Sequence, residues 1–246
     1  MRSYGDGLFD ASGNGDAVLL LHGVSDNRLG VYGYGELLLR NGYSVLLPDA
    51  RAHGVSGGEL ATYGLKESDD IHRWVTWIAE NQHPRCVFGF GESMGAAHIL
   101  QALAKETRFC GVIAESTFES FRKVSYARFG RPFHTGPWLG RTFFWPTDEI
   151  GFLYVRLRYG LDMDLASPKE AVAASKVPVF LIHGIRDRNI PPYNSEDIQV
   201  ANPTKAVLWL VPQAAHCGAR GVAPEEFDRR ILLWLTEHSL PKHYTI

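Results

Sequence analysis

The stretch GFGESMGA at residues 89–96 places Ser93 between two glycines in the pattern G-x-S-x-G. An apolar run at 85–90 precedes this serine, and a run with helical spacing follows it. A serine on a very tight turn from strand to helix is held in a strained backbone conformation, and the glycines let neighbouring chain approach closely. Such a turn exposes the serine hydroxyl, so the stretch predicts that Ser93 is a nucleophile.

Short apolar runs like the one before Ser93 recur along the chain, bounded by turn residues. They lie at 17–22, 44–49, 85–90, 111–115, 177–183 and 205–212. Each run is apolar on both faces, which is typical of strands in a parallel sheet. Segments with helical spacing alternate with the runs, the last of them at about 224–238. This alternation predicts an α/β fold with a mostly parallel sheet and helices on both faces.

The segment from about 117 to 168 breaks this alternation, because it is rich in aromatic residues and Arg and contains no obvious strand. We expect it to form a helical cap inserted between two strands. Most of its aromatic side chains should pack against the sheet, and some should line an acyl or aryl pocket. At 246 residues the chain suits one domain with a buried core, so we expect residues 1–246 to form a single domain.

Two later residues are candidates for the base and the acid that a nucleophilic serine needs. His216 lies in a loop of small residues, QAAHCG, between the last apolar run and the last helix. Asp187 follows the run at 177–183, in a loop stiffened by two prolines. Glu115, at the end of another run, is the rival acid. Asp187 could instead cap a helix or pair with a neighbouring Arg, and His216 could be an ordinary loop histidine.

The backbone of two loops could stabilise the oxyanion that forms during acyl transfer. The N–H of Met94 is available in the tight turn, and the N–H of Val24 follows His22-Gly23 in LLLHGVSDN at 19–27. We interpret His22 as structural, since the donors in this arrangement are backbone groups. In the loop after the run at 44–49, we expect His53 to brace the backbone and Asp49 to pair with Arg51.

The ordered motifs of this chain resemble those of the α/β-hydrolase family over nearly its whole length. The matching segments are LLLHG (19–23), GYSVLLPDARAHGVSGG (42–58), GFGESMGA (89–96), HGIRDRNIP (183–191) and AAHCG (214–218). The chain order of serine, aspartate and histidine is also that of the family. Within it, the chain is most similar to bacterial esterases and acyl-hydrolases whose HG loop carries an Asn-Arg pair, here Asn27-Arg28.

This resemblance implies a cofactor-free serine hydrolase that cleaves carboxylic esters through an acyl-enzyme on Ser93. Relatives with the same residues cleave amides, peptides or thioesters, so peptidase, amidase and thioesterase activities are the alternatives, and a non-catalytic binding protein on this fold is a further one. Epoxide hydrolases and dehalogenases of this fold use an aspartate nucleophile, which Ser93 disfavours.

Two departures from the family pattern lie in the first third of the chain. Only about sixteen residues precede the first apolar run, so we expect the antiparallel strands at that edge of the sheet to be missing or incomplete. Ala52 stands where relatives commonly have glycine, which should alter the geometry of that loop.

Composition excludes several classes of partner. The formal net charge of -2 gives no broad attraction for nucleic acid, and no histidine or cysteine spacing suggests a metal site. No apolar run is long enough to span a membrane or serve as a signal peptide, so we expect a cytoplasmic protein that acts on a small-molecule ester. No pattern points to an oligomeric state.

The three cysteines do not form a disulfide pattern, and we expect Cys86 and Cys110 to be buried small apolar residues.

Overall fold

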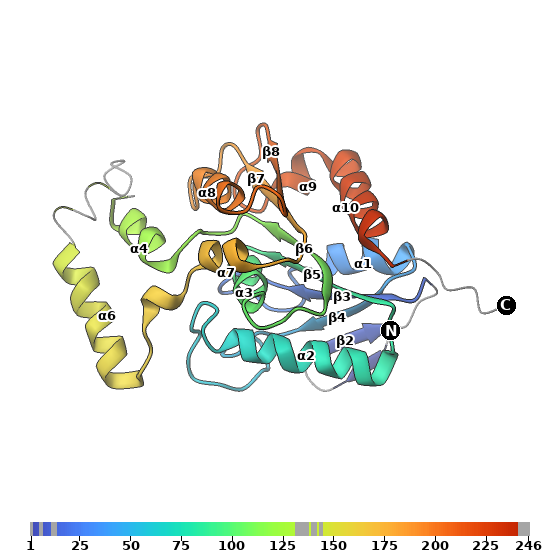
Figure 1. The fold of residues 1–246 in the computed structure, drawn as a ribbon, viewed down its shortest axis with the longest axis horizontal. Coiled ribbons are helices and arrows are strands. Elements are labelled where there is room, and N and C mark those ends of the chain that lie inside the picture. The colour runs from blue at the N-terminus through green and yellow to red at the C-terminus, as the bar shows by residue number, and fades with distance from the viewer. Residues whose placement is uncertain are drawn as a thin grey trace.

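The computed structural model describes residues 2–4, 7–10, 14–130, 138, 142 and 145–240. Within them, an eight-stranded sheet has the order β1-β2-β4-β3-β5-β6-β7-β8 (Figure 1). The strands are β1 Arg2–Tyr4, β2 Gly7–Asp10, β3 Asp16–Leu21, β4 Ser44–Pro48, β5 Cys86–Glu92, β6 Phe109–Glu115, β7 Val179–Gly184 and β8 Ala206–Val211. The strands from β4 to β8 in this order run parallel, which confirms the predicted fold class.

Helices cover both faces of the sheet because successive side chains of each strand point to opposite faces. Leu19 and Leu21 of β3 pack in one apolar core, whereas Val18 and Leu20 pack in the other. The first core is closed by α2 Glu67–Gln82, α3 Met94–Ala102, α7 Pro168–Ala174 and α8 Tyr193–Ala201, and the second by α1 Tyr32–Arg40, α9 Ala219–Val222 and α10 Pro224–His238. No helix in the described ranges is long and apolar enough to cross a membrane.

The N-terminal edge of the sheet differs from the prediction. β1 and β2 form an antiparallel pair, and β2 also pairs antiparallel with β4, with Leu8 opposite Leu47. The expectation that these edge strands are missing was therefore wrong. The strands are only three and four residues long, which is too short to show the alternation by which strands are recognised in a sequence.

The expectation that Cys86 and Cys110 are unbonded was also wrong, because they form a disulfide with a Cα–Cα distance of 5.7 Å. β5 and β6 are parallel neighbours, and the register between them shifts at Val87 and Phe88, so that Cys110 falls between the partners of these two residues. The shift brings two cysteines 24 residues apart into bonding range, and Cys217 remains as the free thiol.

The chain between β6 and β7, residues 116–178, is called the β6–β7 insertion below. It contains α4 Phe121–Gly130, α6 Trp145–Tyr159, the short 3-10 helix η2 Met163–Leu165 and α7, and its described part contains no strand. Figure 1 shows α4 and α6 at one end of the molecule, beyond the helices that flank the sheet. The predicted cap at 117–168 includes residues 131–137, 139–141, 143 and 144, which lie outside the described residues.

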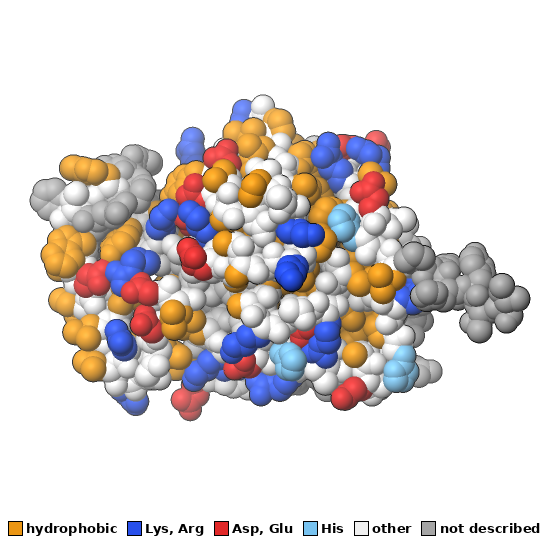
Figure 2. Space-filling view, viewed as in Figure 1, with side chains coloured by type: hydrophobic (Ala, Val, Ile, Leu, Met, Phe, Trp, Pro, Cys, Tyr) orange, Lys and Arg blue, Asp and Glu red, His pale blue; other side chains and the backbone are white. Residues whose placement is uncertain are grey.

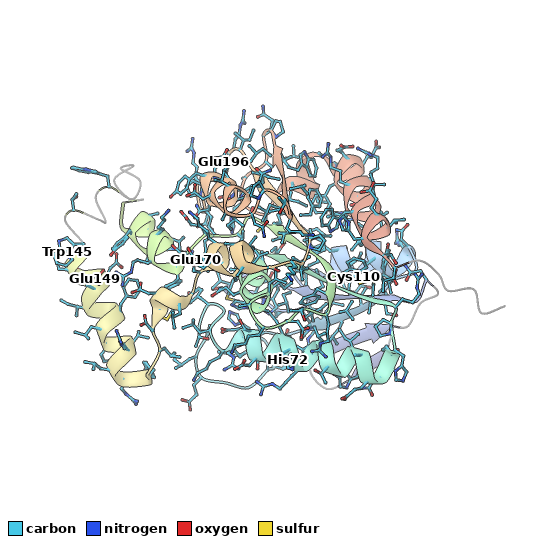
Figure 3. The ribbon with its side chains drawn as sticks, viewed as in Figure 1. His72, Cys110, Trp145, Glu149, Glu170 and Glu196 are labelled. Atoms are coloured by element: carbon cyan, nitrogen blue, oxygen red, sulfur yellow. A yellow bond between two sulfur atoms is a disulfide. The ribbon has the colours of Figure 1, made fainter. Side chains whose placement is uncertain are left out.

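An ion-pair network joins the two long helices of this insertion. Arg122 of α4 binds Glu149 of α6 and Asp164 of η2, and its guanidinium lies 4.5 Å from the centre of the Phe152 ring. Figure 3 shows Glu149 and Trp145 on α6, far from Cys110 in the sheet. The insertion is therefore held together by contacts among its own helices as well as by the sheet.

Candidate active site

Ser93 stands on the tight turn between β5 and α3, as the sequence predicts. Its φ is +51°, a conformation that non-glycine residues rarely adopt, and it is held there by a hydrogen bond from its N–H to the carbonyl of Glu115. A Cβ on Gly91 would lie 2.5 Å from the carbonyl carbon of Gly95, and one on Gly95 would lie 2.5 Å from the carbonyl oxygen of Leu21. The turn can close only because both positions are glycine.

The three residues predicted to act together are in contact. Nε2 of His216 lies 2.9 Å from Oγ of Ser93, and Nδ1 of His216 lies 2.7 Å from Oδ2 of Asp187. Because an ionised carboxylate can only accept hydrogen bonds, Nδ1 carries the proton and Nε2 is left to accept from the Ser93 hydroxyl. The loops after β5, β7 and β8 thus bring serine, aspartate and histidine into one chain of hydrogen bonds.

The Asp187 carboxylate is buried and fully engaged. Its Oδ1 accepts from the N–H groups of Asn189 and Ile190, and its Oδ2 also lies 3.4 Å from Nε2 of His183. Burial alone would raise the pKa of Asp187, but the contacts with His183 and His216 outweigh burial and hold the pKa below its usual range. Asp187 is therefore ionised at neutral pH and can stabilise a positive charge on His216.

Glu115, the rival acid, has other partners. Its Oε2 accepts from the Tyr34 hydroxyl at 3.2 Å, and its Oε1 accepts from the N–H of Ala219 at 3.0 Å. The neighbouring Ser116 Oγ accepts from the N–H of Cys217. The end of β6 thus anchors the chain just after His216. Sequence reasoning missed this role, which becomes visible only when the order of the strands is known.

Val24 and Met94, the two predicted oxyanion donors, line a small pocket with Ser93 whose volume is about 100 Å³. The loop before Val24 is fixed by His22, which donates from Nδ1 to the Gly23 carbonyl at 2.8 Å and accepts at Nε2 from the N–H of Ala50 at 3.0 Å. These contacts agree with the predicted structural role of His22, and they tie the loop after β3 to the loop after β4.

Glu92, next to Ser93, is a further residue that sequence reasoning missed. Burial, followed by the negative charges of Glu115 and Asp26, raises its pKa to about 7, while the backbone of Gly23 provides a partly compensating hydrogen bond. The variable position of a G-x-S-x-G pattern gives no signal for such a group. A carboxyl that titrates near neutrality therefore lies between the Ser93 turn and the loop of Val24.

The predicted pair of Asp49 and Arg51 does not form. Asp49 accepts instead from the side chain and the N–H of Arg28, and Arg51 pairs with Asp70 on α2 at 2.6 Å. β3 and β4 are neighbours, so the loops after them meet and bring Arg28 to Asp49. His53 braces its loop as predicted, through the carbonyl of Arg51.

Ala52, in the same loop, has a φ of +59°, a region that favours glycine. Glycine adopts this conformation without steric cost, whereas alanine carries a small strain there.

Comparison with known protein families and sequences agrees with this architecture. A sequence model of the alpha/beta hydrolase family matches residues 18–230. Among curated sequences, the uncharacterized protein YqkD of Bacillus subtilis is 28% identical over 207 residues, and YfhR of Escherichia coli is 25% identical over 204 residues. Each match covers 82% of this chain, but the chain spans only 65% and 63% of the lengths of these two relatives.

Solved structures show the same arrangement. The esterase Pf2001 of Pyrococcus furiosus superposes with a TM-score of 0.74 and 26% identity, over 94% of this chain and 86% of that one. A thermophilic esterase from Thermogutta terrifontis superposes with a TM-score of 0.64 at 20% identity, over 95% of this chain and 94% of that one, which indicates a shared fold.

Proposed function

Since this chain belongs to the alpha/beta hydrolase family, we propose that it is a serine hydrolase that cleaves carboxylic esters of small molecules through an acyl-enzyme on Ser93. The observation that carries the proposal is the continuous hydrogen-bond chain from Ser93 through His216 to Asp187, with distances of 2.9 and 2.7 Å. The similarity to the Pyrococcus furiosus esterase supports esters as the substrate class.

In the first half of the reaction, His216 accepts the proton of the Ser93 hydroxyl through Nε2 as Oγ attacks the acyl carbonyl. The buried Asp187 carboxylate stabilises the imidazolium that results. The N–H groups of Val24 and Met94 donate to the oxyanion of the tetrahedral intermediate. Collapse of this intermediate breaks the ester bond, and Nε2–H of His216 donates its proton to the departing alcohol.

In the second half, water enters the position that the alcohol has left. His216 accepts a proton from this water at Nε2, and the hydroxide attacks the acyl group on Ser93. A second tetrahedral intermediate forms against the same two N–H groups. When it collapses, the proton returns to the Ser93 oxygen and the free acid leaves, so the enzyme is regenerated.

The test is an assay of the purified protein on p-nitrophenyl acetate and butyrate, beside Ser93→Ala and His216→Ala. We expect hydrolysis by the wild type and a loss of kcat of about 10⁴-fold or more in each variant, because the two residues act as one unit. His53→Ala is the matched control, since this histidine braces a loop through a backbone contact, and it should keep activity within about tenfold of the wild type.

An inert wild type on every ester would contradict the proposal. Turnover of acyl-thioesters or amides under the same conditions would then mean that Ser93 acts on a different class of acyl substrate. Labelling of Ser93 by a fluorophosphonate probe separates these outcomes from a non-catalytic protein, because the probe reacts only with an activated serine.

A further inference from the structure

A second, larger cavity adjoins the small pocket at Ser93. It lies between the loop before α2 and the helices α4 and α6, and its volume is about 390 Å³, compared with about 100 Å³ for the pocket at Ser93. Cavities of roughly 300 Å³ and above are large enough to bind small molecules. The pocket that contains the nucleophile is therefore too small for a large substrate, and the space for one lies next to it.

The two cavities share three lining residues, Tyr63, Phe121 and Ser125. The rings of Tyr63 and Phe121 are in contact, with 4.3 Å between their centres, and each ring lines both cavities. A group bonded to an acyl carbonyl at Ser93 that extends in this direction passes beside the two rings. The shared residues thus form the boundary between the small pocket at Ser93 and the larger cavity.

The lining of the larger cavity is chiefly apolar. Side chains such as Leu60, Phe152, Val155 and Met163 contribute to it, and Asp148 carries the one formal charge among the described lining residues. Asp148 is only 8% exposed, and its Oδ2 has no hydrogen-bond partner among the described residues. A second negative charge in this cavity would be repelled by a carboxylate that is poorly solvated. The chemistry of the lining therefore suits an uncharged apolar group.

We propose that the cavity between the loop at 60–63 and helices α4 and α6 binds an uncharged apolar arm of the ester, which makes medium-chain esters the preferred substrate class. The inference rests on the proposed function and adds to it the place and chemistry of the second binding site. Each methylene that enters the cavity should raise kcat/KM by at most about fourfold, and the increase should stop once the cavity is filled. Esters whose acyl chain ends in a carboxylate should be cleaved more slowly than their uncharged counterparts.

The test compares p-nitrophenyl acetate, butyrate, octanoate and the p-nitrophenyl monoester of octanedioic acid on three proteins. Val155→Trp fills the cavity from a position that lines it. Leu153→Trp, on the same helix, places the same side chain at a residue that is 55% exposed and does not line the cavity. Figure 2 shows hydrophobic side chains gathered at the end of the molecule where α6 lies, so this control keeps the surface character unchanged.

We expect the wild type to prefer octanoate over acetate by about tenfold or more and to cleave octanoate about tenfold faster than its carboxylated counterpart. Val155→Trp should lose the preference for octanoate over acetate, and Leu153→Trp should match the wild type on both esters. A wild type that is equally active on acetate and octanoate, or a Val155→Trp variant that keeps the preference, would overturn the inference and leave the esterase proposal intact.

Ester binding by inactive variants tests this inference independently of the proposed reaction. The inactive Ser93→Ala variant should bind p-nitrophenyl octanoate more tightly than the acetate, and Ser93→Ala combined with Val155→Trp should lose that difference. This result would support the cavity even if the wild type hydrolysed no ester. Equal binding of the two esters by Ser93→Ala would overturn it.

Discussion

The turn that carries Ser93 and the β6–β7 insertion face the same pocket, but they are built in different ways. A Cβ on Gly95 would lie 2.5 Å from the Leu21 carbonyl, so the turn leaves no room for any other residue. On α6, by contrast, a Cβ on Gly151 would meet no atom within 4 Å, and Leu157 is 78% exposed. The Ser93 turn is therefore fixed by backbone contacts, whereas α6 of the insertion has room for other side chains.

The difference separates two tasks of a hydrolase. Proton transfer and oxyanion stabilisation need donors and acceptors held within a few tenths of an ångström, which packed strands and tight turns provide. Choice of substrate depends on the size and polarity of a cavity wall, which side chains on an inserted helix can change without moving the reacting groups. Substitutions at the Ser93 turn should therefore change the rate of the reaction, whereas substitutions in the β6–β7 insertion should change which substrate is preferred.

The largest expected effect tests which carboxylate, Asp187 or Glu115, is the acid that pairs with His216. Asp187→Asn should lower kcat/KM by about 10⁴-fold, because the amide no longer holds His216 with its proton on Nδ1. Glu115→Gln should cost less than about tenfold, since the glutamine oxygen can still accept from the N–H of Ala219 and its NH2 group can donate to the Tyr34 hydroxyl. Steady-state kinetics on p-nitrophenyl butyrate measures both. A larger loss in Glu115→Gln than in Asp187→Asn would reverse the assignment of the acid.

The next effect concerns pH and Glu92, whose pKa is raised from about 4.5 to about 7. Both folded and unfolded protein hold this proton below about pH 4.5. As the pH rises to about 7, the unfolded chain loses the proton first, so Glu92 destabilises the fold increasingly over this window. Relative to the wild type, Glu92→Gln should therefore gain up to about 3 kcal/mol in free energy of unfolding between pH 4.5 and pH 8.

Urea unfolding at a series of pH values measures this difference. Glu225→Gln, on the exposed first turn of α10, is the control for loss of a negative charge from the surface. The difference between Glu92→Gln and the wild type should grow with pH, whereas that between Glu225→Gln and the wild type should stay small. A constant difference for Glu92→Gln would mean that Glu92 has the same pKa in the folded and the unfolded protein, and the raised pKa would be wrong.

Much of the fixed region could be predicted from the sequence because its constraints are local. The glycines around Ser93, the apolar run before it and the helical run after it all lie within a few residues of each other. Asp187 and His216 were found because each follows an apolar strand. In a parallel sheet, the loops after neighbouring strands meet at one edge.

The features that the sequence did not predict depend on how strands are paired. The disulfide of Cys86 and Cys110 depends on the register of β5 against β6, and the partner of Asp49 depends on β3 lying beside β4. The cavity wall is harder still to predict. Tyr63 and Phe121 are 58 residues apart in sequence by their numbers, and no periodicity brings them together.

The smallest effects test the comparison of the two regions directly, with one substitution in each. Gly95→Ala should lower the free energy of unfolding by about 1–3 kcal/mol, because the backbone around Leu21 must shift to admit the methyl group. Gly151→Ala, at the wall of the larger cavity on α6, should raise it by up to about 1 kcal/mol, since alanine favours the helix and its Cβ would meet no atom within 4 Å. Urea unfolding of both variants beside the wild type measures the two changes. If Gly151→Ala proved as destabilising as Gly95→Ala, the insertion would be as tightly packed as the Ser93 turn, and the contrast between a fixed catalytic region and an adjustable cavity wall would be wrong.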